Sequence, residues 1–319
     1  MDADTAQFED RTSPTEILFL EEAKNARKNA YAPYSGYRVG VALETKNGSL
    51  ITGCNVECVD YTGLEAIESA ISRLVSLQDW RKDSDSACVT RAVFAVPRLD
   101  YESLVHYPSP KSLGRLRFFA HDTLHMTFVD ESGQSEDCTL DDLLPRSPNI
   151  HQSMARFSHQ TPISMPPRTA HDSAATHPLV DDDILGLLDT TRRHSIAPSS
   201  GYTVSVVVKS TAGHLYSGCN VETAMHSAIH AEESALSNMI CAEGPTAKLD
   251  TVYVLTSGDK AGWPCGNCRQ KLYEFAHEKT LIRAVNQQGE YEEKPLTELL
   301  PNGFTAAHIP ATGGDTPAS

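Results

Sequence analysis

Hydrophobic residues recur with the spacing of a helix in some segments of the chain and with that of a strand in others. The order of these segments is the same in the two halves of the chain. In the first half, an amphipathic segment from Pro14 to about Ala30 predicts a helix, with Ser13 as its N-cap. Alternating runs at Tyr37–Leu43 and Leu50–Gly53 flank an Asn-Gly pair, which predicts a hairpin. The elements expected after it are a helix at Glu65–Leu77, a strand at Arg91–Val96, a further helix, and a strand at Leu124–Phe128.

The second half repeats this order. The elements expected there are a helix at about Val180–Arg193, strands at Thr203–Lys209 and Leu215–Gly218, a helix at Ser227–Cys241, and strands at Thr251–Leu255 and Leu281–Val285. A hairpin followed by strands that alternate with helices predicts an α/β fold of three layers, α/β/α, with a mixed sheet.

The two halves are also alike residue by residue. Segments 32–57 and 197–222 align without a gap and agree at 14 of 26 positions, and shorter matches follow in both halves. A unit of about 120 residues is too long for a solenoid repeat, so we interpret the pattern as a tandem duplication of a whole domain. The expected boundaries are a first unit at 14–146, a linker rich in Ser, Pro and His at 147–179, a second unit at 180–304, and a flexible tail at 305–319.

Charge and composition narrow the possible partners. The 27 Lys and Arg against 42 Asp and Glu give a net charge of −15, which repels a phosphate backbone and favours an uncharged or cationic small molecule over a nucleic-acid polymer. No apolar run approaches the roughly 18 residues of a membrane helix. The acidic N-terminus lacks the apolar core of a secretory signal. We therefore expect a cytoplasmic protein with its eight cysteines reduced.

A group of metal-binding residue types lies in the second unit. Cys265 and Cys268 are separated by two residues and can bind one ion, and His230 can supply a third ligand. Three N and S ligands leave one tetrahedral position open, which is typical of catalytic zinc. A lone Cys-x-x-Cys is often a redox pair or half of a structural site. A structural site needs a fourth ligand, for which His226 and Cys241 are the nearest candidates.

Glu232 completes the pattern. It follows His230 by two positions, and with Pro264 before the first cysteine the spacing is that of zinc deaminases. Zinc makes water a nucleophile at neutral pH, and a carboxylate beside it can accept the proton. We expect Cys265 and Cys268 to open a helix, whose dipole favours the thiolate.

Four segments of the second unit, SGYTV (200–204), SGCNVE (217–222), HAEESA (230–235) and PCGNCRQ (264–270), resemble the cytidine deaminase family, in its two-domain type with His-Cys-Cys zinc. The resemblance extends over about 20–145 and 185–304. It implies hydrolytic deamination of cytidine and deoxycytidine to uridine and deoxyuridine plus ammonia, as in pyrimidine salvage, with one zinc per chain. It also implies that His230, Cys265 and Cys268 are the zinc ligands and that Glu232 is the proton shuttle.

The same resemblance implies residues that contact substrate. Asn220 and Glu222 correspond to a pair that binds the ribose 3′-hydroxyl, although turn chemistry after a strand is the alternative. Tyr202 corresponds to an aromatic residue beside the base, with a plain core position as the alternative. Phe304 resembles a residue that covers the substrate, and Tyr61 one that reaches into a neighbouring site. We therefore expect the first unit to wall the site, and two chains to form a homodimer that is a pseudo-tetramer of units.

The first unit lacks the metal-binding and proton-transfer residues that the second unit has. The residues at the positions of the ligands and the shuttle are Glu65, Ile67, Ser109 and Ser112. Isoleucine moves no proton and serine binds zinc poorly, so this copy is expected to be non-catalytic. Asn55, Glu57 and Tyr37 remain, either as hairpin structure, which we favour, or as a residual nucleoside pocket. The catalytic copy comes second, whereas two-domain members of the family have it first.

Two other functions stay open on the sequence. One is a deaminase of another cytosine-containing amine, and the other is a non-catalytic nucleoside-binding scaffold.

Overall fold

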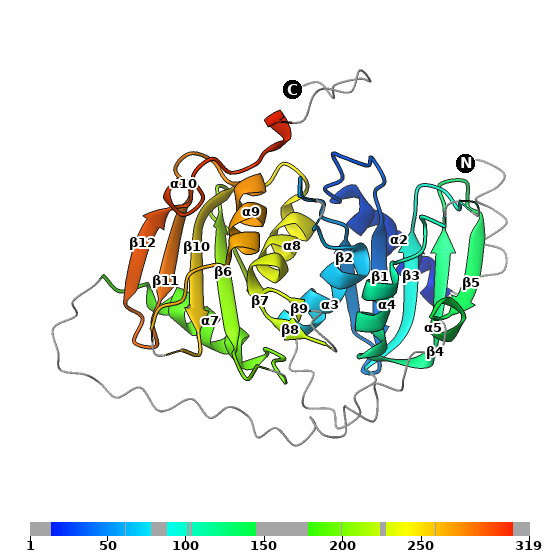
Figure 1. The fold of residues 1–319 in the computed structure, drawn as a ribbon. Coiled ribbons are helices and arrows are strands. Elements are labelled where there is room, and N and C mark those ends of the chain that lie inside the picture. Colours follow the sequence, from blue (N-terminus) through cyan, green and yellow to red (C-terminus); the bar gives the residue numbers. More distant parts are fainter. Residues whose placement is uncertain are drawn as a thin grey trace.

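The computed structural model describes residues 14–60, 62–77, 88–100, 102, 104–144, 178–198, 200–223, 228–258 and 260–308. Within these residues the chain forms two units of like topology, each built on a five-stranded sheet (Figure 1). The predictions for Ser13, Tyr61, His226, most of the linker and residues 309–319 of the tail lie outside the described residues.

The first unit has strand order β2-β1-β3-β4-β5. Its strands are β1 (Gly40–Thr45), β2 (Leu50–Cys54), β3 (Val89–Ala95), β4 (Ala120–Val129) and β5 (Ser135–Thr139), and its helices are α2 (Pro14–Lys28), α3 (Ala66–Leu77), α4 (Pro110–Arg117) and α5 (Leu140–Leu143). Because β3 and β4 are parallel and the other pairings are antiparallel, the sheet is mixed, as predicted.

The second unit repeats this order as β7-β6-β10-β11-β12. Its sheet consists of β6 (Val204–Ser210), β7 (Leu215–Cys219), β10 (Leu249–Thr256), β11 (Leu281–Val285) and β12 (Tyr291–Pro295). Its helices are α7 (Asp182–Arg193), α8 (Ala231–Glu243), α9 (Gly266–Phe275) and α10 (Leu296–Leu299), with a 3-10 turn at Ala306–His308. A separate two-stranded ribbon pairs β8 (Val221–Glu222) with β9 (Ala228–Ile229).

Alternation along the central strands produces the three layers. In β6, Val206 and Val208 pack in the core that includes α8, whereas Val207 packs in the core that includes α7. In β1, Val41 packs with α3 and Ala42 with α2. Successive side chains of a strand point to opposite faces, so each sheet is covered on both sides and the predicted α/β/α fold is confirmed.

Two features differ from the sequence prediction. The helix expected from Ser227 begins at Ala231, because Ala228 and Ile229 pair with β8 instead. The edge strands β5 and β12 were not predicted, since their sequences SEDCT and YEEKP are polar and carry no apolar alternation.

The two units share their cores. The helices α3 and α8 lie against each other at the centre of the molecule (Figure 1), where the Ser72 and Ser237 hydroxyls are 3.1 Å apart and those of Ser76 and Ser234 are 3.0 Å apart. Each hydrophobic core includes residues of the other unit. The first-unit core takes in Ile196, Cys219, Val221 and Ile229, and the second-unit core takes in Ala30, Cys54, Val56 and Cys58. The first unit is therefore part of the scaffold of the second. None of the described helices has both the length and the apolar character needed to cross a membrane.

Candidate active site

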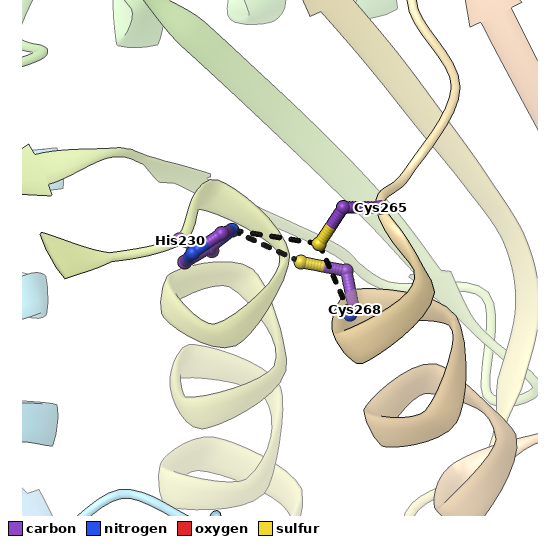
Figure 2. Close-up of side chains that lie close together, drawn as sticks. All are labelled: His230, Cys265 and Cys268. Carbon is purple, nitrogen blue, oxygen red and sulfur yellow. Dashed lines mark hydrogen bonds between the residues drawn. The ribbon is translucent and has the colours of Figure 1, made fainter.

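The three predicted metal-binding side chains meet at the N-terminal ends of two helices. His230 is the N-cap of α8, Cys265 is the N-cap of α9, and Cys268 lies in the first turn of α9. The Nδ1 atom of His230 is 3.3 Å from the Cys268 Sγ atom and 3.9 Å from the Cys265 Sγ atom (Figure 2). The expectation that the cysteines open a helix is confirmed.

The spacing of these atoms fits a zinc ion. Zinc binds sulfur at about 2.3 Å and nitrogen at about 2.1 Å, so tetrahedral donors lie roughly 3.6 to 3.8 Å from one another. The three ligand atoms all lie within 4.8 Å of one another. Among the described residues no fourth His, Cys, Asp or Glu joins this group. Cys241, a candidate fourth ligand in the sequence, instead lies with its Sγ atom 3.3 Å from that of Cys54. The donor set is therefore that of an open, catalytic type of zinc site.

Local hydrogen bonds favour one thiolate in this group. The hydrogen bond with Cys268 lowers the pKa of the Cys265 thiol to about 5, and the Cys268 backbone N–H, 3.5 Å from the Cys265 Sγ atom, acts in the same direction. The hydrogen bond with Cys265, together with burial, raises the pKa of the Cys268 thiol. A sulfur ligand is thus ready to bind a cation at neutral pH.

Glu232 is buried beside this group. It is 5% exposed and lies beside Cys268. Burial raises the pKa of the Glu232 carboxyl. The side chain is therefore in place to exchange protons with a molecule bound next to the cysteines.

A buried ion pair holds the two helices of the site together. Glu233 of α8 accepts a hydrogen bond from the His230 backbone N–H at 2.6 Å and pairs with the ammonium group of Lys271 on α9. The position of Glu233, three residues after the helix N-cap, could have indicated the first contact, which is half of a capping box. Lys271 was missed because no local pattern indicates it.

Asn220 and Glu222 fix the loop that leads into β6. The Asn220 side chain accepts from the Val204 N–H at 2.8 Å and donates to the Tyr202 carbonyl at 2.9 Å. Glu222 accepts hydrogen bonds from the backbone N–H and hydroxyl of Ser200. The turn chemistry expected as the alternative for this pair is therefore present.

The first unit has the same arrangement. Asn55 accepts from the Val39 N–H at 2.8 Å and donates to the Tyr37 carbonyl at 3.0 Å, and Glu57 accepts from the Ser35 N–H and hydroxyl. Asn55 and Glu57 thus hold the corresponding loop of the first unit, as the interpretation of retained hairpin structure expects.

Two predicted substrate contacts are exposed aromatic residues. Tyr202 is 45% exposed, so the alternative that it is a plain core residue is wrong. Phe304 is also 45% exposed and stacks on His308, with ring centroids 5.4 Å apart. Gln270 of α9 binds the Phe304 backbone, donating to its carbonyl at 2.7 Å and accepting from its N–H at 3.2 Å. Phe304 is therefore attached to the helix that carries the cysteines.

The equivalent region of the first unit holds no metal-binding group among the described residues. Glu65, at the position of His230, accepts a hydrogen bond from the Ser109 N–H at 2.9 Å. Ile67, at the position of Glu232, is 1% exposed and belongs to the core. Ser109 caps α4 by accepting from the Ser112 N–H at 3.3 Å. The replaced residues now serve helix capping and packing.

The first unit contacts the site helix directly. The Thr62 hydroxyl is 3.3 Å from the side-chain oxygen of Asn267, which lies between the two cysteines. The Tyr31 hydroxyl donates to Glu274 of α9 at 2.8 Å, and the Tyr34 hydroxyl donates to the same oxygen. The sequence does not indicate a role for Thr62, Tyr31 or Tyr34, because their contacts with α9 arise only from the packing of the two units.

A duplicated α/β fold with a His-Cys-Cys group at two helix N-termini and a buried glutamate beside it defines the class of zinc-binding deaminase domains. Comparison with known families agrees. Residues 184–284 and residues 2–97 each match a family described as "Cytidine and deoxycytidylate deaminase zinc-binding region". The chain belongs to the cytidine and deoxycytidylate deaminase family, with two copies of the domain, and it is a zinc protein.

Curated relatives include Cytidine deaminase 3 of Arabidopsis thaliana, 36% identical over 118 residues, which are 35% of this chain and 52% of that protein. The cytidine deaminase of Photobacterium profundum is 34% identical over 143 residues, 44% of each chain. That of Mycoplasma genitalium is 31% identical over 114 residues, 35% of this chain and 85% of that protein. The matched part of the chain thus spans about half the length of the first two relatives and most of the third.

Proposed function

We propose that the chain catalyses the zinc-dependent hydrolytic deamination of cytidine and deoxycytidine to uridine and deoxyuridine. The observation that carries this proposal is the meeting of His230, Cys265 and Cys268 beside the buried Glu232. The relatives named cytidine deaminase support it as well.

In this proposal His230, Cys265 and Cys268 would hold the zinc ion, which would supply a water molecule activated for attack at neutral pH. Glu232 takes a proton from the attacking water and delivers it to N3 of the cytosine ring as the water oxygen adds to C4. Glu232 then passes the second proton to the amino group, the bond from C4 to that nitrogen breaks, and ammonia leaves as the C4 carbonyl forms.

We assign nucleoside recognition to the neighbouring polar and aromatic residues. Asn220 and Glu222 bind the ribose 3′-hydroxyl with the hydrogen-bonding capacity that remains beyond their loop contacts, and Tyr202 lies beside the base. Phe304 covers the substrate. An apolar wall with a few polar groups is the usual surrounding of an uncharged ligand. Replacing Asn220 with Ala is expected to raise KM for cytidine about tenfold or more while zinc content is unchanged.

The decisive experiment follows ultraviolet absorbance with cytidine, deoxycytidine and cytosine. Wild-type protein is expected to convert both nucleosides. Glu232→Gln is expected to lose at least about 10²- to 10⁴-fold in kcat while retaining one zinc per chain. The matched control is Glu278→Gln, an exposed carboxylate of the same unit, which is expected to leave turnover unchanged. Unchanged turnover in Glu232→Gln would remove the assigned role, and turnover of cytosine alone would indicate another amine as the substrate.

We propose further that two chains form a homodimer, a pseudo-tetramer of four units. The family resemblance supports this, as does the exposure of two large aromatic side chains, Tyr202 and Phe304, which a neighbouring chain could cover. Light scattering on the zinc-loaded protein is expected to give twice the mass of the chain. A monomer with full activity would contradict the proposal.

We also propose that the protein works in the cytoplasm. In support, no disulfide links any of the eight cysteines, all of which lie in the described residues, and the site needs Cys265 and Cys268 reduced. Fractionation of cells that express the tagged chain is expected to recover it with cytosolic markers. Recovery in a secreted or organelle fraction would overturn this.

A further inference from the structure

One buried cation of the first unit makes a hydrogen bond to the second unit next to the candidate active site. Arg115 lies on α4 and is 2% exposed. One arm of its guanidinium pairs with Glu68 on α3, and the other donates to the backbone carbonyl of Ala228 at 2.8 Å. Both arms are thus engaged, one in each unit.

The pair of Arg115 and Glu68 corresponds to the pair of Lys271 and Glu233 in the second unit. In the alignment of the two halves, Glu68 is at the position of Glu233 and Arg115 at that of Lys271. The second-unit pair joins the two helices of the zinc group. The first unit has kept the pair although its own metal ligands are gone, and it has an arginine where the second unit has a lysine.

The carbonyl that Arg115 binds belongs to a strand with two links to the site. Ala228 pairs with Glu222, and Ile229 pairs with Val221, in the ribbon of β8 and β9. His230 follows Ile229 directly. Because Val221 and Ile229 are fully buried in the first-unit core, the ribbon is seated on the unit that carries Arg115.

An arginine suits this position for a physical reason. Its planar fork directs separate N–H groups at two acceptors, whereas the lysine ammonium is a compact charge on a flexible stem. A charge-assisted hydrogen bond in a buried place is stronger than a neutral one and fixes direction. The fork can therefore keep its ion pair with Glu68 and hold the Ala228 carbonyl at the same time.

We propose that Arg115 is a positioning residue for the active site of the second unit. By holding Ala228 it fixes the ribbon on which Glu222 lies, and so sets the sugar-binding side of the site relative to His230. This inference rests on the proposed nucleoside deamination. It assigns the non-catalytic unit a specific part in substrate recognition, in addition to its share of the core.

The test compares Arg115→Lys with Arg117→Lys in the full zinc-loaded protein. Arg117 is a buried arginine of the same helix that pairs with Asp122 of the first unit, so it matches in residue type and burial. Arg115→Lys is expected to keep one zinc per chain and a near-wild-type unfolding temperature, because lysine can still pair with Glu68. Its kcat/KM for cytidine is expected to fall roughly three- to tenfold, mainly through KM, for the loss of one hydrogen bond that positions the ribbon.

Two readouts separate positioning from general structural support. The preference for cytidine over 3′-deoxycytidine is expected to shrink in Arg115→Lys, because Glu222 would hold the 3′-hydroxyl less well. Amide hydrogen exchange at residues 221–222 and 228–230 is expected to accelerate. Arg117→Lys is expected to change neither. A folded Arg115→Lys protein with wild-type exchange in this segment and wild-type discrimination would overturn the proposal.

The outcomes also distinguish this inference from the proposed function. If wild-type protein deaminates no nucleoside, the proposed function fails, and hydrogen exchange still decides whether Arg115 holds the ribbon. If Arg115→Lys does not fold, the double variant Glu68→Gln with Arg115→Gln removes the buried charges together and is expected to show the same faster exchange. Failure of both variants to fold would contradict a role directed at the ribbon.

Discussion

The ion pair between Glu233 and Lys271 allows a quantitative test of how the active site is held together. Both side chains are less than one-tenth exposed, with Glu233 at 7% and Lys271 at 3%. They connect α8, whose N-cap is His230, to α9, whose N-cap is Cys265. Replacing Lys271 with Met removes the cation but keeps most of the side-chain volume, so that Glu233 is left buried without its partner.

The expected cost follows from burial. Removing one member of a buried ion pair destabilises a protein by about 3 to 5 kcal/mol, because the remaining charge is uncompensated. With a urea m value of about 2 kcal/mol/M, the midpoint of the unfolding transition is expected to fall by about 1.5 to 2.5 M. Glu233→Gln in the same chain removes the charge while its side-chain oxygen can still accept from the His230 N–H. The double variant is therefore expected to recover most of the loss.

The assay is urea unfolding of the zinc-loaded protein, followed by circular dichroism, with zinc content measured on the same samples. The matched control is Lys279→Met, an exposed lysine of the same unit, which is expected to change the free energy of unfolding by less than about 0.5 kcal/mol. A Lys271→Met protein as stable as wild type, or a double variant less stable than Lys271→Met, would refute the argument that the buried charges of Glu233 and Lys271 compensate each other.

Three further outcomes follow from the structure. Removing zinc with a chelator is expected to abolish deamination and lower the unfolding temperature, and added zinc is expected to restore both. Ser76→Ala leaves the buried Ser234 hydroxyl without that cross-unit partner, and chemical denaturation is expected to show a loss of about 1 to 3 kcal/mol. Gly218→Ala would place its Cβ atom 2.2 Å from the backbone nitrogen of Ala235 and is expected to lower the free energy of unfolding in chemical denaturation. Gly186 lies in α7, and a Cβ atom there meets no atom within 4 Å. Gly186→Ala is therefore expected to raise the free energy of unfolding by about 0.5 to 1 kcal/mol. Equal effects of the two glycine variants would contradict this account of the contact between β7 and α8.

The layers of the fold and the zinc group could be predicted because their information is local. The run Val204–Val208 is apolar at every position except Ser205, which suits a central strand covered on both faces. The zinc group could be predicted because the cysteines are adjacent in one helix turn and His230 lies at the start of another. These patterns involve a few neighbouring residues and can be recognised in the sequence without knowledge of the packing.

The remaining features depend on tertiary contacts. The ribbon of β8 and β9 forms from two-residue strands, too short to leave a pattern in the sequence. It displaced the predicted start of α8 from Ser227 to Ala231. Tyr202 is aromatic in a strand-like run, and only the fold shows that it is exposed. The bond from Arg115 to Ala228 joins residues 113 positions apart, and nothing near either one indicates it.

The pattern of losses in the first unit has a physical explanation. Cysteine, histidine and glutamate gathered in a buried place are costly without an ion, because their charges and polar groups lack partners. The first unit has Ile67 and Ser112 at two of these positions, and both are fully buried without a charge. The side chains of the first unit at its contact with the second unit are of another kind. Ser72 and Ser76 still meet α8, and Arg115 still pairs with Glu68, because each of these faces the other unit or supports a residue that does. A copy without the metal-binding residues is thus free of the constraint that metal binding imposes but not of the constraint that the interface imposes, so substitutions at the interface are expected to affect the second unit as well as the first.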